Sequence, residues 1–135
     1  MNMDLFTVIG APVKMAIQAI ASATTTNSTG IDLHTSTYKT AEGVALLVIT
    51  VDAVGGVCDV ALQDSADDST YAAIAAGAGG AQAIAQVASG SSSSSVLQIQ
   101  LENVRRYIRI STITGAGTTS TEVHATIDFM KPGKR

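Results

Sequence analysis

Residues Cys58–Tyr71 read C-D-V-A-L-Q-D-S-A-D-D-S-T-Y, a succession that predicts a strand, an acidic turn and the start of a second strand. Cys58, Val60 and Leu62 alternate with polar or small residues, which is the two-residue period of a strand with one buried face. From Asp64 to Thr70, the Asp and Ser side chains can hydrogen-bond nearby backbone groups, and this favours a turn over a helix or a strand. The stretch therefore predicts one β-hairpin corner.

The same alternation recurs in both directions from this corner. Leu97–Leu101 and Arg105–Ile113 alternate apolar and polar residues, and Ile108 and Ile110 of the second run are expected to face inward. The clearest case is the last strand, with Val123, Ala125, Ile127 and Phe129 facing in and Glu122, His124, Thr126 and Asp128 facing out. Clusters of Gly, Ser and Thr separate roughly seven to nine such segments. This arrangement predicts an all-β fold, a single-domain antiparallel β-sandwich that is jelly-roll-like.

The segment Gly43–Val51 differs from the others because it is apolar on both faces. Such a strand lies in the middle of a sheet that is covered on each side, or it lies in a subunit contact. Both explanations stay open from the residues alone. Asp52–Gly56 is expected to form the turn that follows, because paired glycines supply positive φ angles at little cost.

Other segments have weaker patterns. Ala11–Ala21 is compatible with a helix that begins at a proline and with a strand, and we favour the strand. Ala81–Ala88 is also ambiguous, and its neighbours favour a strand. Thr24–Gly30 and Ser89–Ser95 are predicted to be loops from their composition, and Gly115–Ser120 is predicted to be the last hairpin loop.

A chain of 135 residues is sized for one domain with one core. We expect residues 1–30 to form an N-terminal arm and the first strand or loop, residues 31–130 the β-sandwich, and residues 131–135 a basic C-terminal tail. Pro132 is expected to keep this tail out of any ladder. The extended arm lacks a clean period, but it carries four apolar residues suited to docking on another surface: Leu5, Phe6, Val8 and Ile9.

Composition excludes several classes of partner. The net charge of −3 argues against binding to a polyanion, so no nucleic acid is expected. No apolar run approaches the ~20 residues needed to span a bilayer, so no membrane is expected. Val13–Ala23 ends in Ala-Ser-Ala, which is similar to a signal-peptidase site. Asp4 precedes it in place of a positive cluster, and Lys14 and Gln18 interrupt it, so we expect the segment to stay in the mature protein.

No pattern of catalytic residues is present. Cys58 is the single cysteine and is most simply a small buried hydrophobe on its strand. His34 and His124 lie in different segments, and neither is linked to Cys58 by a motif. The sequence contains no nucleophile elbow, phosphate-cradling loop or dinucleotide fingerprint. We therefore expect no catalytic residues, no cofactor and no enzyme activity.

The acidic turn is the one local cluster of carboxylates. Asp64, Asp67 and Asp68, with two serines beside them, could gather oxygen ligands for calcium. The cluster lacks the alternate-position spacing and the glycine of a calcium loop. A solvated turn is the favoured interpretation, and no metal is expected, with these three residues as the weak candidate.

Three arginines, Arg105, Arg106 and Arg109, concentrate much of the positive charge, and Arg105 and Arg109 are expected to share a strand face with Tyr107. The face is either solvated or a subunit contact, because Arg and Tyr are enriched at interfaces. Arg105, Tyr107 and Arg109 are therefore candidate interaction residues, and both interpretations stay open.

The order of four segments resembles the family of tailed-bacteriophage head decoration (cement) or auxiliary capsid proteins. The segments are Gly30–Leu33, Val44–Val51, Val60–Tyr71 and Arg106–Ile110, and the resemblance covers roughly Thr24–Phe129. The family often has a glycine after the second Asp of the turn, where this chain has Ser69. The Ala- and Gly-rich run Ala72–Ala88 also departs from the family pattern.

The resemblance implies a non-enzymatic virion structural protein, made in the host cytoplasm and present on the capsid outer surface. It implies that the protein binds the major capsid protein and copies of itself in a homo-oligomer, for which a trimer is one option, and that it stabilises the capsid. Two alternatives are a tail or head-fibre component and a host- or carbohydrate-binding β module. The second would need an exposed aromatic platform, and three Tyr and no Trp provide little for one.

Overall fold

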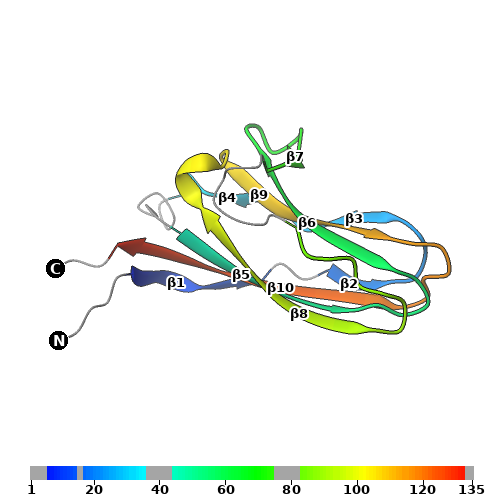
Figure 1. The fold of residues 1–135 in the computed structure, drawn as a ribbon. Helices are drawn as coiled ribbons and strands as arrows, with labels where there is room; N and C mark the ends of the chain where they lie inside the picture. The colour runs from blue at the N-terminus through cyan, green and yellow to red at the C-terminus, as the bar shows by residue number, and fades with distance from the viewer. Residues whose placement is uncertain (1–5, 15–16, 36–43, 75–82, 133–135) are drawn as a thin grey trace, which may run out of the picture.

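In the computed structural model, which describes residues 6–14, 17–35, 44–74 and 83–132, two antiparallel sheets of five strands pack face to face (Figure 1). Sheet A has the order β1-β10-β5-β8, with β2 also paired to β10; its strands are β1 (Phe6–Lys14), β2 (Ile17–Ile20), β5 (Val44–Asp52), β8 (Ser92–Gln100) and β10 (Thr121–Pro132). Sheet B has the order β3-β9-β6-β7, with β4 also paired to β9; its strands are β3 (Thr25–Asn27), β4 (Ile31–Asp32), β6 (Cys58–Ser65), β7 (Ala72–Ala73) and β9 (Tyr107–Thr114). A short 3-10 turn, η1 (Leu101–Asn103), follows β8. The predicted all-β sandwich is confirmed.

The core lies between the two sheets and is almost entirely aliphatic. The inward-facing residues predicted for β6, β9 and β10 are all buried, and Phe129 is the largest fully buried side chain. β5 contributes Ala45, Leu47, Ile49 and Val51, each without solvent exposure. Burying one Leu, Ile or Val side chain contributes roughly 1.5–3 kcal/mol relative to leaving it exposed. The alternating strands therefore supply the main favourable term for folding.

The two predicted turns at Asp52–Gly56 and Gly115–Ser120 are both connections between the sheets. The first joins β5 to β6 and the second joins β9 to β10, so the prediction that Gly115–Ser120 closes a hairpin was wrong. The two connections pack on one another, and the Thr119 N–H donates to the Val54 carbonyl over 3.1 Å. Gly55 and Gly117 have φ angles of 80° and 87°, and a Cβ on either would collide with the other's carbonyl oxygen. Local alternation predicts strands but cannot tell which sheet each joins.

Three local predictions were wrong because a neighbouring strand overrides composition. Thr24–Gly30, expected to be a loop, contains β3, which pairs with β9. Ser92–Ser95, also expected to be loop, is the first half of β8 and pairs with β5. Pro132 lies at the end of β10 opposite Phe6, so it does not keep the chain out of the ladder. A strand end tolerates proline because few ladder bonds are lost there.

The remaining segments follow the predictions more closely. The strand preference for Ala11–Ala21 is confirmed where the structure describes it, in the end of β1 and in β2. Ala83 and Val87 make isolated bridges to Ala61 and Cys58 of β6, so this part of Ala81–Ala88 is extended without forming a full strand. Within the described ranges, no helix has the length and apolar character needed to cross a bilayer.

Candidate functional site

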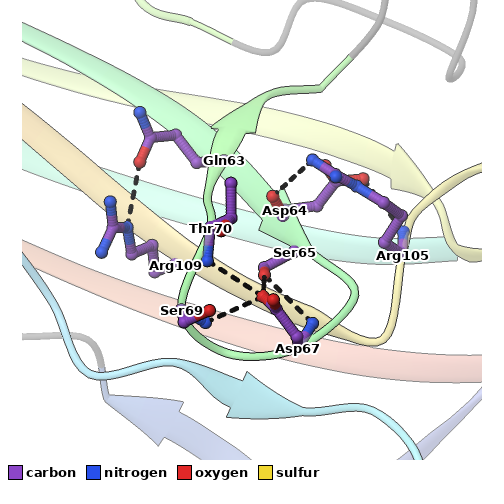
Figure 2. A network of polar contacts seen from close by, with 8 residues as sticks. All are labelled: Gln63, Asp64, Ser65, Asp67, Ser69, Thr70, Arg105 and Arg109. Atoms are coloured by element: carbon purple, nitrogen blue, oxygen red, sulfur yellow. Dashed lines mark hydrogen bonds and ion pairs between the residues drawn. The ribbon is translucent and has the colours of Figure 1, made fainter.

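The acidic turn connects β6 to β7 at one end of sheet B. Gln63 pairs with Ala73 and Asp64 with Ala72, so the predicted hairpin corner is confirmed. Figure 2 shows separate groups of polar contacts in and beside the turn: Gln63 with Arg109, Asp64 with Arg105, and Asp67 with Ser65, Ser69 and Thr70. Asp68 has a φ of 61°, the left-handed conformation that Asp tolerates better than most residues. The Asp-rich composition therefore has a structural cause within the turn.

Asp64 is the buried member of the three aspartates, with 8% of its side chain exposed. Its Oδ1 accepts hydrogen bonds from Nε and Nη2 of Arg105 at 2.8 and 2.6 Å, and its Oδ2 accepts one from the Arg105 backbone N–H at 2.9 Å (Figure 2). Arg105 Nη2 also donates to the Asp64 carbonyl at 2.7 Å. A buried carboxylate needs such compensation, since desolvating an unpaired charge is costly. The prediction of a solvated turn was wrong for Asp64.

Asp67 organises the turn itself. Its Oδ1 accepts hydrogen bonds from the backbone N–H groups of Thr70 (2.9 Å) and Ser69 (3.0 Å) and from the Ser65 hydroxyl (2.9 Å) (Figure 2). These bonds stabilise the ionised form, chiefly those from Thr70 and then Ser69, and they hold the pKa of Asp67 well below its usual range. The Asp67 carboxylate therefore holds the backbone of the turn in its conformation.

Asp68 contacts the residue that ends the turn. The Tyr71 hydroxyl donates to the Asp68 carboxylate, and burial followed by this bond raises the pKa of Tyr71 to about 12. Gly30, just before β4, lies against the same pair, because a Cβ there would collide with the Tyr71 hydroxyl oxygen and with Asp68 Oδ1. The chain thus needs a very small residue at position 30, where the close approach leaves no room for a side chain.

The structure does not assemble the three aspartates into a metal site. Asp64 is bonded to Arg105, Asp67 to the turn backbone and Asp68 to Tyr71. Across the residues that the structure describes, no group of three His, Cys, Asp or Glu side chains is arranged to hold a metal ion. Cys58 is fully buried, as predicted, and this burial raises the pKa of its thiol.

Two arginines stack on the two tyrosines near the turn. The Arg109 guanidinium lies 3.9 Å from the centroid of the Tyr71 ring, and its Nε donates to Gln63 Oε1 at 2.9 Å. The Arg106 guanidinium lies 4.9 Å from the centroid of the Tyr107 ring. Each tyrosine therefore has one ring face occupied by a cation.

Arg106 also links β4 to the start of β9. Its Nε and Nη2 donate to the two carboxylate oxygens of Asp32 at 2.9 and 2.8 Å, and this lowers the pKa of Asp32 to about 2. Sequence reasoning noted Arg106 only as part of a cluster, although Asp32 lies 74 residues away. No local signal indicates such a pair. The candidate interaction residues Arg105 and Arg109 are thus engaged within the chain, and a subunit contact through them remains a prediction.

The outer face of sheet A is the second notable surface. Val48 on β5 lies directly opposite Val96 on β8, and these side chains are 38% and 63% exposed. Leu46 is half-buried beside them, and the flanking Thr50 and Gln98 are exposed and neutral. In the part of the chain that the structure describes, sheet B covers only the inner face of β5. Of the two explanations for an apolar β5, a contact with another subunit fits this arrangement better.

The apolar N-terminal residues fall on the edge of sheet A. Phe6, Val8 and Ile9 lie in β1, where their partners on β10 are Pro132, Met130 and Phe129. Part of the predicted arm is therefore a sheet strand. Leu5 lies outside the described residues.

No protein-family model matches the chain, and no curated protein matches it either. Among solved structures, the exported protein XepA of PBSX has a TM-score of 0.62 at 12% identity, and the match covers 98% of this chain and 40% of that protein. The chain thus spans about two fifths of the length of that structure. A protein of disulfide-linked Bacillus endospore appendages (TM-score 0.48, 20% identity, 96% and 93% covered) and the C-terminal family 22 carbohydrate-binding module of Clostridium thermocellum Xyn10B (0.48, 8%, 99% and 91%) also match. The XepA likeness shows the fold.

Proposed function

We propose that the chain is a non-enzymatic virion structural protein that decorates and stabilises a tailed-phage capsid. In this proposal it binds the major capsid protein and neighbouring copies of itself on the outer surface of the capsid. Three things support it: the resemblance of four segments to phage decoration proteins, a sandwich fold shared with the exported protein XepA of PBSX, and the exposed Val48–Val96 pair on the outer face of sheet A.

The observation that carries the proposal is the Val48–Val96 pair. β-branched residues on adjacent strands cover one another only partly, so their burial against a partner would be favourable. Thr50, Thr126 and Gln98 border the pair, and Asp128 and His124 lie farther along β10 on the same face. This arrangement matches the apolar centre and polar rim of a protein interface, on a small scale. The chain has only 14% charged residues, so few charges oppose close packing on a shell. We expect this face to contact the capsid protein.

The aromatic residues do not favour a carbohydrate-binding module. A sugar platform needs exposed ring faces, and arginine side chains lie over one face of Tyr71 and one face of Tyr107. Among the described residues of sheet B, the strongly exposed large apolar side chain is that of Ile113, which is aliphatic.

Cryo-electron microscopy of virions from the source that carries the gene tests the proposal. We expect density for the sandwich in a regular array on the outer shell, with the face of Val48 and Val96 toward the capsid protein. Density in the tail or in a fibre would support the tail or head-fibre alternative, and virions without the protein would contradict the proposal altogether.

A pelleting assay with capsids of the major capsid protein tests the contact face. Val48→Lys should abolish co-sedimentation, because it places a charge at the apolar centre. Ile113→Lys is the matched control, since Ile113 is 54% exposed on sheet B and should tolerate lysine without loss of binding. Unchanged binding of Val48→Lys would exclude this face.

A further inference from the structure

The edge strand β8 has none of the features that usually protect a sheet edge. It is nine residues long and contains no charged residue, proline or glycine. Its register with β5 runs without interruption from Val44–Gln100 to Asp52–Ser92. Figure 1 shows β8 along the margin of sheet A, and among the described residues β5 is the one strand paired with it. A long, regular, uncharged edge is a ready template for another strand.

The other sheet edges are protected. β1 has a register shift between Ile9 and Val13, contains Gly10 and Pro12, and ends at Lys14. β2, which also borders sheet A, contains four residues and pairs irregularly with β10. In sheet B, β3, β4 and β7 contain three, two and two residues. Irregularity, proline, lysine and short length are the usual means of preventing unwanted strand pairing. Among the described edge strands, β8 is the one without any of these features. We therefore infer that its edge pairs with another strand.

The backbone groups that face outward from β8 follow from its pairing. The Ala53 N–H donates to the Ser91 carbonyl at 3.0 Å, and antiparallel hydrogen bonding then alternates along the strand. The N–H and C=O groups of Ser92, Ser94, Val96 and Gln98 consequently point away from β5. Among the described residues, Val96 is also the most exposed large apolar side chain, at 63%.

We propose that β8 pairs with β8 of a second copy of this chain, antiparallel about a two-fold axis at Val96, and joins the two A sheets into one. In this register Val96 lies opposite itself and Ser94 lies opposite Gln98. A two-fold axis one residue away would place Val96 against serine or glutamine. Because the strand carries no charge, self-pairing brings no like charges together, and the contact is isologous. The inference rests on the proposed function and refines its self-association. The dimer would use the outward backbone groups at the edge of β8, whereas the capsid contact would use the adjoining sheet face on which Val48 and Val96 lie.

Sedimentation velocity of the full chain over a wide range of concentration tests the pairing. We expect a concentration-dependent dimer for the wild type. Ser94→Pro removes an outward N–H and leaves the ladder with β5 intact, so it should weaken dimerisation at least tenfold while circular dichroism still reports the folded sandwich. Ile113→Lys is the control, because Ile113 is exposed on β9 of sheet B, away from β8, and this change should leave the dimer unchanged. A wild type that stays monomeric, a trimer, or full dimerisation of Ser94→Pro would overturn the proposal.

Oxidative cross-linking tests the register independently. In a hydrogen-bonded antiparallel pair the Cα atoms are about 5.5 Å apart, which is within disulfide range. Val96→Cys should form a cross-linked dimer, whereas Ser92→Cys should not, since its partner is Gln100. Cross-linking of Ser92→Cys in preference to Val96→Cys would overturn the register. A wild-type chain that dimerises but does not bind capsids would contradict the proposed function and leave this pairing standing.

Discussion

The two sheets of the sandwich are held together in different ways. Sheet A has five strands of four to twelve residues, and the long ladders β1–β10, β10–β5 and β5–β8 hold it together. Sheet B has three strands of two or three residues, and side chains fasten them. The Thr112 hydroxyl donates to the Thr26 carbonyl at 2.8 Å, and Ser28 Oγ accepts the Ile110 N–H at 3.0 Å. The ion pairs Arg106–Asp32 and Arg105–Asp64 also hold segments of sheet B in place.

Because of this difference, substitutions in sheet B and on the surface of sheet A should affect different properties of the protein. A short strand forms few ladder bonds, so loss of one polar side chain in sheet B removes a large share of what holds its segment. A long ladder loses little from a change on its outer face. Polar substitutions in sheet B should therefore lower the free energy of unfolding, while substitutions on the face or edge of sheet A should change contacts with other molecules.

The largest expected effect is at Asp64. Asp64→Ala leaves the Arg105 guanidinium without its carboxylate and the Arg105 backbone N–H without this acceptor. It should lower the free energy of unfolding by about 2 kcal/mol, less than for a fully buried pair because the Arg105 side chain is 44% exposed. Urea unfolding followed by circular dichroism measures this. Asp59→Ala, on the outer face of the same strand, is the control and should cost less than about 0.5 kcal/mol. Equal effects of the two substitutions would show that the Asp64 pair does not anchor sheet B.

A smaller effect is expected at Thr112, which is fully buried in sheet B. Thr112→Val keeps the shape but removes the bond to the Thr26 carbonyl, and should cost about 1 kcal/mol. Thr50→Val, on the exposed face of β5 in sheet A, should be nearly neutral. The same urea experiment compares them, and a greater loss from Thr50→Val would reverse the proposed difference between the sheets.

The smallest expected effect is a loss of stability in acid. Asp32 has a pKa of about 2 in the folded protein, against the ordinary value of 3.8 for an aspartate, and the pKa of Asp67 is also lowered. Their ionised forms therefore stabilise the fold above the unfolded-state pKa, and this contribution is lost as pH falls from about 4 through the folded pKa. The melting temperature should fall across this window, and less steeply in the variant Asp67→Asn. An identical pH slope in that variant would contradict the role given to the Asp67 carboxylate.

Much of the fold could be predicted because a strand with one buried face repeats every two residues. Val123 to Phe129 and Cys58 to Leu62 follow this period closely, and both face the core as expected. Prediction failed where distant residues decide the outcome. Ser92–Ser95 has the composition of a loop, yet β5 supplies a complete ladder partner. The candidate site was predicted only in part, since the acidic turn was found but the partner of Asp64 was not.

The sequence by itself determined the class of fold, the aliphatic core and the hairpin corner at Cys58–Tyr71, because alternation and turn chemistry act within a few residues. Only the tertiary structure decided that β9 and β10 belong to different sheets, that Asp64 is buried against Arg105, and that Val48 and Val96 meet on an open face. Each of these depends on segments far apart in the chain, whose pairing reflects the summed burial and hydrogen bonding of the whole sandwich.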